Sequence, residues 1–243
     1  GGRNGYGAKL TNIFSTKFTV EIVDAKRKKK FVQTWTDNMS VANKPSVRKL
    51  TAKNIKSYIK LTFYPDLSKF GLDSMDNDHL SLFQQRTLEI AATTANVKVH
   101  FNNENMTVSN FKKFMEMFYP GETIYHDSSK RWEVGAIYMP DQGNEVISYV
   151  NGISTFKGGT HVNHVVDGLI KRLINDYIKK KDKTIKVSTN LIKESMVFFV
   201  NAVIVNPSFT SQTKTTLTTK VKSFGSSYKA TEVFMKKLAK SGI

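Results

Sequence analysis

Apolar and polar residues alternate in several short segments of the chain, and a period of two predicts half-buried β-strands. In the segment Lys17–Val23, Phe18, Val20 and Ile22 share one side, and Thr19 and Glu21 share the other. The same pattern, or a short apolar run ended by turn residues, predicts further strands at Phe31–Thr36, Lys56–Tyr64, Val97–Phe101, Trp132–Met139, Val146–Asn151 and Met196–Val205.

Turn residues suggest how neighbouring strands are joined. The basic run Lys26–Lys30 lies between the first two strands, so we expect a hairpin with a charged tip. Five like charges in a turn are usually only solvated. The segment Pro140–Asn144 lies between two later strands, Trp132–Met139 and Val146–Asn151, and we expect these to form a second antiparallel hairpin.

Apolar residues three and four positions apart predict helices elsewhere. The clearest helical pattern runs from Val162 to Ile178 and ends in Lys179, Lys180 and Lys181, with Thr160 placed to cap its N-terminus. Weaker patterns predict helices at Asp76–Thr93, Phe111–Tyr119 and Thr231–Lys240. Strands and helices are therefore mixed, and we predict an α+β fold in the form of a two-layer α/β sandwich.

Composition sets limits on the class of protein. The chain has 243 residues, of which 40% are hydrophobic and 16 are phenylalanine, enough for one or two domains with a core. No apolar run approaches the roughly eighteen residues of a membrane span, so no membrane partner is expected. The absence of cysteine excludes disulfides and thiolate metal sites.

The net charge of +17 is spread over both halves of the chain. A basic globular body is typical of proteins that bind polyanions. A lysine-rich solvated surface would give the same composition, and a non-enzymatic nucleic-acid-binding module also fits it.

The first nine residues, Gly1–Lys9, contain four glycines, Arg3 and Lys9. Glycine allows close backbone approach to a ligand, and a helix that starts after such a loop directs free amide groups toward an anion. Two known phosphate-binding motifs do not match. The Walker A loop requires Ser or Thr after its lysine, and Leu10 follows Lys9. The dinucleotide-binding motif G-x-G-x-x-G also fails, because Leu10 stands where its third glycine would be. Spacing alone therefore leaves a plain glycine-rich loop open.

This segment nevertheless resembles the ATP lid of eukaryotic-type type IIA DNA topoisomerases. The resemblance continues in the same order along nearly the whole chain, and it is carried by the stretches Gly2–Leu10, Asn12–Ser15, Pro65–Phe70, Lys157–Val162, Ser211–Lys214 and Lys222–Ser226. It implies that residues 1–110 are the C-terminal part of an ATPase domain of the gyrase, chaperone and histidine-kinase (GHKL) type. Residues 111–243 would be a ribosomal-protein-like transducer domain.

The resemblance also implies roles for individual residues. The lid residues would wrap the phosphates of ATP: Gly2, Arg3, Asn4, Gly5, Tyr6, Gly7, Ala8 and Lys9. Gln212, Thr213 and Lys214 occupy the places of the family's γ-phosphate-sensing loop, at residues 211–215 here, and Lys214 would stabilise the transition state. If that loop is extended, the side chains of Gln212 and Lys214 leave the same side. From the residues alone, such a pair is more often plain surface.

The remaining expectations concern partners. The resemblance suggests that Lys179, Lys180 and Lys181 line a cavity for double-stranded DNA, although lysines at a helix C-terminus also complement its dipole. It implies a nuclear homodimer that uses ATP and Mg²⁺, with the Mg²⁺ ligands and the general base outside this sequence. The chain alone is expected to be inactive. His161 and His164 have a spacing that can bind a metal, but no third ligand lies near them in the sequence, so we expect no metal site there.

The family implied is an ATP-dependent isomerase that passes one DNA duplex through a transient double-strand break in another. Another GHKL ATPase, a chaperone or a mismatch-repair protein, is the nearest alternative. The amino-acid sequences of Arg3–Gly7 and Lys222–Ser226 favour the topoisomerase branch.

Overall fold

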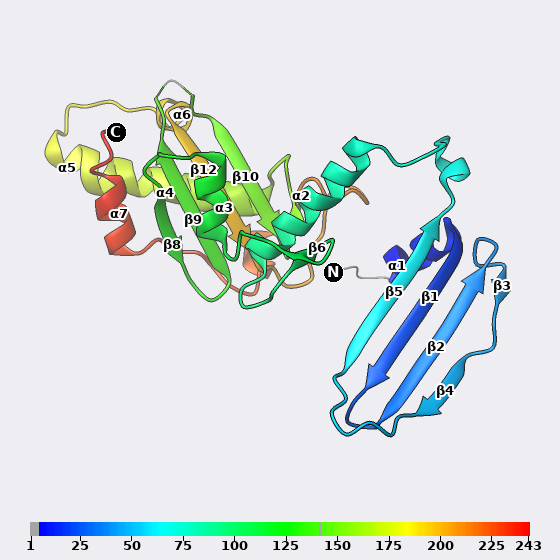
Figure 1. Cartoon of the computed structure of the whole chain (residues 1–243). Helices are drawn as coiled ribbons and strands as arrows, with labels where there is room; N and C mark the ends of the chain where they lie inside the picture. Colours follow the sequence, from blue (N-terminus) through cyan, green and yellow to red (C-terminus); the bar gives the residue numbers. More distant parts are fainter. Residues whose placement is uncertain (1–4, 141) are drawn as a thin grey trace. The chain divides into compact units, whose positions relative to one another are not determined.

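The computed structural model describes residues 5–140 and 142–243. The chain forms two compact units, Gly1–Leu80 and Ser81–Ile243 (Figure 1). The division after residue 80 separates the two parts of the chain that are each compact. The domain boundary predicted near residue 110 concerns the family's domains and stays a prediction.

The first unit is built on a five-stranded antiparallel sheet. Its strands follow the order β3-β2-β1-β5, and β4 also pairs with β2. Phe18 on β1 lies opposite Trp35 on β2, and the Phe18 side chain is buried against the Trp35 ring. The predicted hairpin with a charged tip is therefore present. The strands are β1 Ser15–Asp24, β2 Lys29–Thr36, β3 Val41–Ala42, β4 Ser46–Lys49 and β5 Tyr58–Pro65.

The second unit contains a five-stranded sheet in the order β11-β10-β12-β9-β8. Its strands are β8 Tyr125–Ser128, β9 Trp132–Tyr138, β10 Glu145–Val150, β11 Ile153–Ser154 and β12 Met196–Ala202. A separate two-stranded ribbon joins β6 His100–Phe101 to β7 Glu104–Asn105.

The expected hairpin between β9 and β10 is wrong, because β12 lies between them. β12 pairs with β9 in antiparallel and with β10 in parallel orientation. Every residue of β12 is buried, as its apolar sequence Met196–Ala202 requires of a central strand. A strand that contributes buried side chains to both faces gains more in the middle of the sheet than at its edge.

Helices cover both faces of this sheet (Figure 1). On one face, Phe198 and Val134 pack with Leu169 and Ile170 of α4 Thr160–Arg172. On the other face, Phe199 packs with α3 Phe111–Phe118 and with the end of α2 Asn77–Thr93. The remaining helices are α1 Tyr6–Ile13, α5 Lys179–Lys181, α6 Thr189–Glu194, α7 Glu232–Leu238, and the 3₁₀ turns η1 Leu67–Phe70 and η3 Val221–Ser223.

Helix α4 continues into a π-helical segment, η2 Leu173–Ile178, and then into α5. Its N-terminal residue differs from the expectation: Gly159 is the N-cap, and Thr160 is the first helical residue. The Thr160 hydroxyl donates instead to the carbonyl of Thr219, at 2.7 Å. In the described part of the chain, no helix is both long and apolar enough to cross a membrane.

Candidate functional site

The loop that carries Gln212, Thr213 and Lys214 is a tight turn at the tip of two paired chain segments. The amide of Lys214 donates to the carbonyl of Ser211 at 3.1 Å, which closes the turn. Below it, Thr210 N–H donates to Thr216 at 3.1 Å and Thr218 N–H donates to Ser208 at 2.9 Å. The loop is therefore not extended, so the expectation that the side chains of Gln212 and Lys214 leave the same side of an extended chain does not apply. Gln212 and Thr213 occupy the exposed corners of the turn.

Lys214 differs from its neighbours in backbone and burial. Its φ of 58° lies in the left-handed region, which residues other than glycine adopt uncommonly. Gln212 and Thr213 are exposed, whereas Lys214 is half-buried. Within the described residues the Lys214 ammonium makes no ion pair. A half-buried cation without an acidic partner among the described residues is suited to meet an anionic ligand.

Only part of the predicted ATP lid can be placed. Gly2, Arg3 and Asn4 lie outside the described residues. Gly5 has a φ of 69° and forms the N-cap of α1, so Tyr6, Gly7, Ala8 and Lys9 belong to the helix and not to a loop before it. Glycine adopts this φ without strain, which is why the helix can begin here.

The N-terminus of α1 has features that suit a phosphate group. Its N-cap residue, Gly5, has no side chain that could cap it, and its first turn has no acidic residue. The amide groups of that turn therefore have no intrahelical partner, and the helix dipole adds a partial positive charge. Tyr6 and Lys9 are exposed on this helix.

The stretch Pro65–Phe70 holds the other end of α1. The amide of Asp66 donates to the carbonyl of Phe14 at 2.9 Å, and the rings of Phe70 and Phe14 pack with centroids 5.3 Å apart. Hydrogen bonds from Ser68 and Asn38 lower the pKa of Asp66 below its ordinary value, so the carboxylate stays charged. This stretch therefore positions helix α1.

Lys179, Lys180 and Lys181 are exposed at the end of the long helix. The carboxylate of Asp182, next to Lys181, accepts hydrogen bonds from the amide and the hydroxyl of Thr184. Asp176 lies 3.6 Å from Arg172, which also pairs with Glu232. No ion pair to the three lysines occurs among the described residues. Their charge is therefore available to an external anion.

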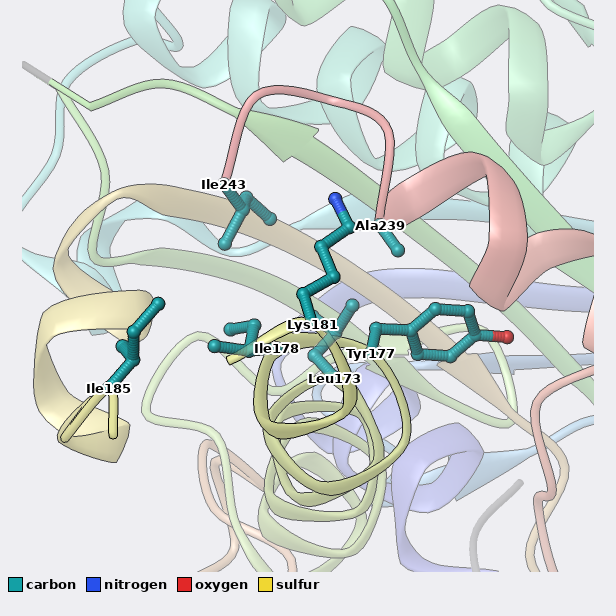
Figure 2. Close-up of a pocket in the computed structure, with 7 residues that line it drawn as sticks. All are labelled: Leu173, Tyr177, Ile178, Lys181, Ile185, Ala239 and Ile243. Carbon is teal, nitrogen blue, oxygen red and sulfur yellow. The ribbon is translucent and has the colours of Figure 1, made fainter. Parts of the chain in front are cut away.

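Helix α7 and the residues after it add three lysines to the same region, and sequence reasoning missed them. Lys181 of α5 lines one small apolar cavity, of about 140 Å³, together with Ala239 and Ile243, which follow α7 (Figure 2). The exposed lysines of α7 and the residue after its C-cap are Lys236, Lys237 and Lys240. The sequence signal that could have found these lysines is their position on the polar side of a helix whose Phe234, Met235 and Leu238 are buried.

The two histidines of α4 have structural partners. His161 is fully buried, and its Nε2 lies 3.1 Å from the Thr155 hydroxyl. His164 Nε2 accepts from the amide of Tyr228 at 3.3 Å. In residues 5–140 and 142–243, no group of three or more His, Cys, Asp or Glu side chains could hold a metal ion.

Comparison with protein families identifies the chain. The family model described as DNA gyrase B matches residues 91–242, well over half of the sequence. The chain belongs to the DNA gyrase B family. This membership, together with the relatives and solved structures described next, confirms the expected resemblance.

Several curated relatives of this DNA gyrase B family member are DNA topoisomerases. It is 44% identical over 250 residues to "DNA topoisomerase 2" of Acanthamoeba polyphaga mimivirus, which covers 100% of this chain and 19% of the relative. It is 43% identical to "DNA topoisomerase 2-alpha" of Sus scrofa over 100% of this chain and 16% of that protein. The chain thus spans less than a fifth of the length of these relatives.

Solved structures confirm the mixed α/β fold of this family member. The ATPase region of Saccharomyces cerevisiae topoisomerase II matches with a TM-score of 0.87 and 39% identity, over 100% of this chain and 62% of that one. The ATPase and transducer domains of Balamuthia mandrillaris DNA topoisomerase II match with a TM-score of 0.90 and 37% identity, over 99% and 62%.

Proposed function

We propose that this chain is the ATP-lid and transducer part of an ATP-dependent type II DNA topoisomerase. The whole enzyme would pass one duplex through a transient double-strand break in another. The observation that carries the proposal is the match, over the full chain, to the ATPase region of a topoisomerase II at 39% identity. The same comparisons favour this function over a nucleic-acid-binding module without enzymatic activity.

Within that enzyme, Lys214 would contact the γ-phosphate of ATP, and Gln212 and Thr213 would contribute polar groups beside it. Lys214 is half-buried and has no acidic partner among residues 5–140 and 142–243, which supports this role. Because hydrolysis removes the γ-phosphate, the contact exists only in the ATP state. A ligand that makes a contact in one state alone shifts the conformational equilibrium toward that state.

The lid helix would bind the other phosphate oxygens through the free amide groups at its N-terminus and through Lys9. ATP would be bound as its Mg²⁺ complex, and no described residue is assigned as a ligand of that ion. The metal would neutralise phosphate charge during phosphoryl transfer.

The lysines of α5 and α7 would contact the phosphates of double-stranded DNA. Exposed lysines without acidic partners attract a polyanion irrespective of its base sequence. As the family resemblance implies, the whole enzyme would be a homodimer that acts in the nucleus.

Relaxation of supercoiled circular DNA by the full-length protein tests this function. We expect relaxation only when ATP is present, and a strong loss of ATP-dependent relaxation in Lys214→Ala. Lys113→Ala is the control, because Lys113 is an exposed lysine of the second unit with no ion pair among the described residues. Relaxation that is independent of ATP, or equal in both variants, would overturn the proposal.

A further inference from the structure

The γ-phosphate-sensing loop has a second, less obvious support. The chain segment that leaves Lys214, Thr215–Thr219, is hydrogen-bonded on both sides. On one side lies the segment Ser208–Thr210, as described above. On the other side lies Lys157–Thr160, whose Lys157 amide donates to the carbonyl of Thr215 at 3.1 Å.

Three further contacts join this second side. Leu217 N–H donates to Gly158 and Thr160 N–H donates to Leu217, both at 3.1 Å, so that Gly159 and Leu217 form a parallel bridge. The Thr160 hydroxyl donates to the carbonyl of Thr219. The Thr219 hydroxyl in turn accepts from the amide of Ser208, at 2.8 Å. The outgoing limb of the sensing loop is therefore tied directly to Lys157–Thr160, and the incoming limb is tied to it only through the outgoing limb.

Gly159 is required by this geometry. Its φ is 135°, which disfavours any residue with a Cβ, and an added Cβ would lie 2.4 Å from the Leu217 carbonyl oxygen and 2.6 Å from its nitrogen. These are backbone atoms, so the clash cannot be relieved by rotating a side chain. Because the Leu217 side chain is buried in the core, the displacement would have to be taken up by the backbone around Leu217, which includes the outgoing limb of the sensing loop.

We propose that Gly159 and Thr160 are positioning residues for Lys214: they fix the outgoing limb of the sensing loop and so hold the Lys214 ammonium where the γ-phosphate is recognised. Lys214 directly precedes this limb, and the carbonyl of the limb's first residue, Thr215, is itself held by the amide of Lys157. A shift of this limb therefore moves Lys214 directly. This inference rests on the proposed role of Lys214.

The test measures ATP turnover and ADP affinity of the full-length enzyme. We expect Gly159→Ala to lower the kcat for ATP about tenfold or more, as Lys214→Ala does, while ADP affinity stays within about twofold. Thr160→Val keeps the shape of the side chain but removes the bond to Thr219, and should lower kcat by a smaller factor. Thr160→Ser restores the hydroxyl and should recover turnover.

Gly168→Ala is the matched control, because Gly168 lies in the same helix and an added Cβ meets nothing within 4 Å. It should leave turnover unchanged. The double variant Gly159→Ala/Lys214→Ala should be no worse than Lys214→Ala alone, since both changes remove one function. If Gly159→Ala does not fold, the turnover of Thr160→Val, Thr160→Ser and Lys214→Ala decides whether the positioning role holds.

The outcomes separate the two ideas. Normal turnover in Gly159→Ala and Thr160→Val, with a defect in Lys214→Ala, overturns the positioning role and leaves the proposed function standing. Losses that multiply in the double variant also overturn it. Normal turnover in Lys214→Ala overturns the role of Lys214 and the positioning inference together.

Discussion

At the scale of single residues, His161 links the fold to pH. Its side chain is buried between α4 and β11, where Thr155 is bonded to both His161 and Ser148. Burial lowers the pKa of His161 to about 4. The histidine is therefore neutral in the folded protein at neutral pH, and an unfolded chain binds a proton more readily.

The sign of the pH dependence follows. Between an unfolded pKa near 6.5 and the folded value, the unfolded state holds more protons, so stability falls as the pH is lowered. We expect His161 alone to reduce the free energy of unfolding by about 2 kcal/mol between pH 7.5 and pH 5. Urea unfolding of this chain, followed by Trp132 emission in a Trp35→Phe background, measures it.

The control compares two substitutions. His161→Gln should flatten the dependence on pH, whereas His100→Gln, which changes an exposed histidine of the same unit, should not. Equal slopes in the two variants would show that another group carries the pH dependence.

At the scale of elements, the long helix shows what sequence patterns can and cannot predict. Its apolar residues come in pairs every four positions: Val165 and Val166, Leu169 and Ile170, Leu173 and Ile174, Tyr177 and Ile178. An α-helix has 3.6 residues per turn, so a four-residue repeat drifts by about 40° each time. The wider π turns of η2 correct this drift. The helix could be predicted from its apolar pattern. The π segment could be predicted only by comparing the four-residue repeat of that pattern with the 3.6 residues per turn of an α-helix.

Other differences come from contacts distant in sequence. β9 and β10 satisfied the local rules for a hairpin, and only the fully buried β12 made a different order more stable. The turn at Ser211–Lys214 depends on the two limbs below it, of which the outgoing one, Thr215–Thr219, pairs with Lys157–Thr160. Candidate site residues could be named from the sequence through the family resemblance, whereas the residues that position them could not.

The lysines at the end of the long helix give a prediction at the same scale. Replacing Lys179, Lys180 and Lys181 by alanine in the full-length protein should weaken binding to duplex DNA. It should also reduce the log–log dependence of affinity on salt, by about 0.9 for each lost phosphate contact. The loss should be the same for DNA of any sequence. Titrations at several salt concentrations measure both effects.

Lys26, Lys29 and Lys49 provide a charge-matched control. All three are exposed on the first unit and make no ion pair among the described residues. Their alanine variant removes the same charge and should keep the salt dependence. An unchanged slope in the α5 variant would mean that its lysines are solvated and only complement the helix dipole.

At the scale of the whole molecule, the second unit connects two proposed functions through one element. The N-terminal residue of α4, Thr160, is bonded to the sensing loop, and the same helix continues through η2 to Lys181. At 1.5 Å per residue, this helix extends for roughly 30 Å. Its two ends would meet ATP and DNA, which offers a direct route by which one ligand influences the other.

The central claim is that Lys214 recognises the γ-phosphate, and nucleotide affinity tests it most directly. The affinities of the full-length protein for ADP and for a non-hydrolysable ATP analogue should be measured with and without Lys214→Ala. Loss of one charged hydrogen bond costs roughly 1.5–3 kcal/mol, so the variant should bind the analogue about tenfold to 150-fold more weakly and bind ADP as the parent does. An equal loss for ADP, or no loss for the analogue, would contradict the account.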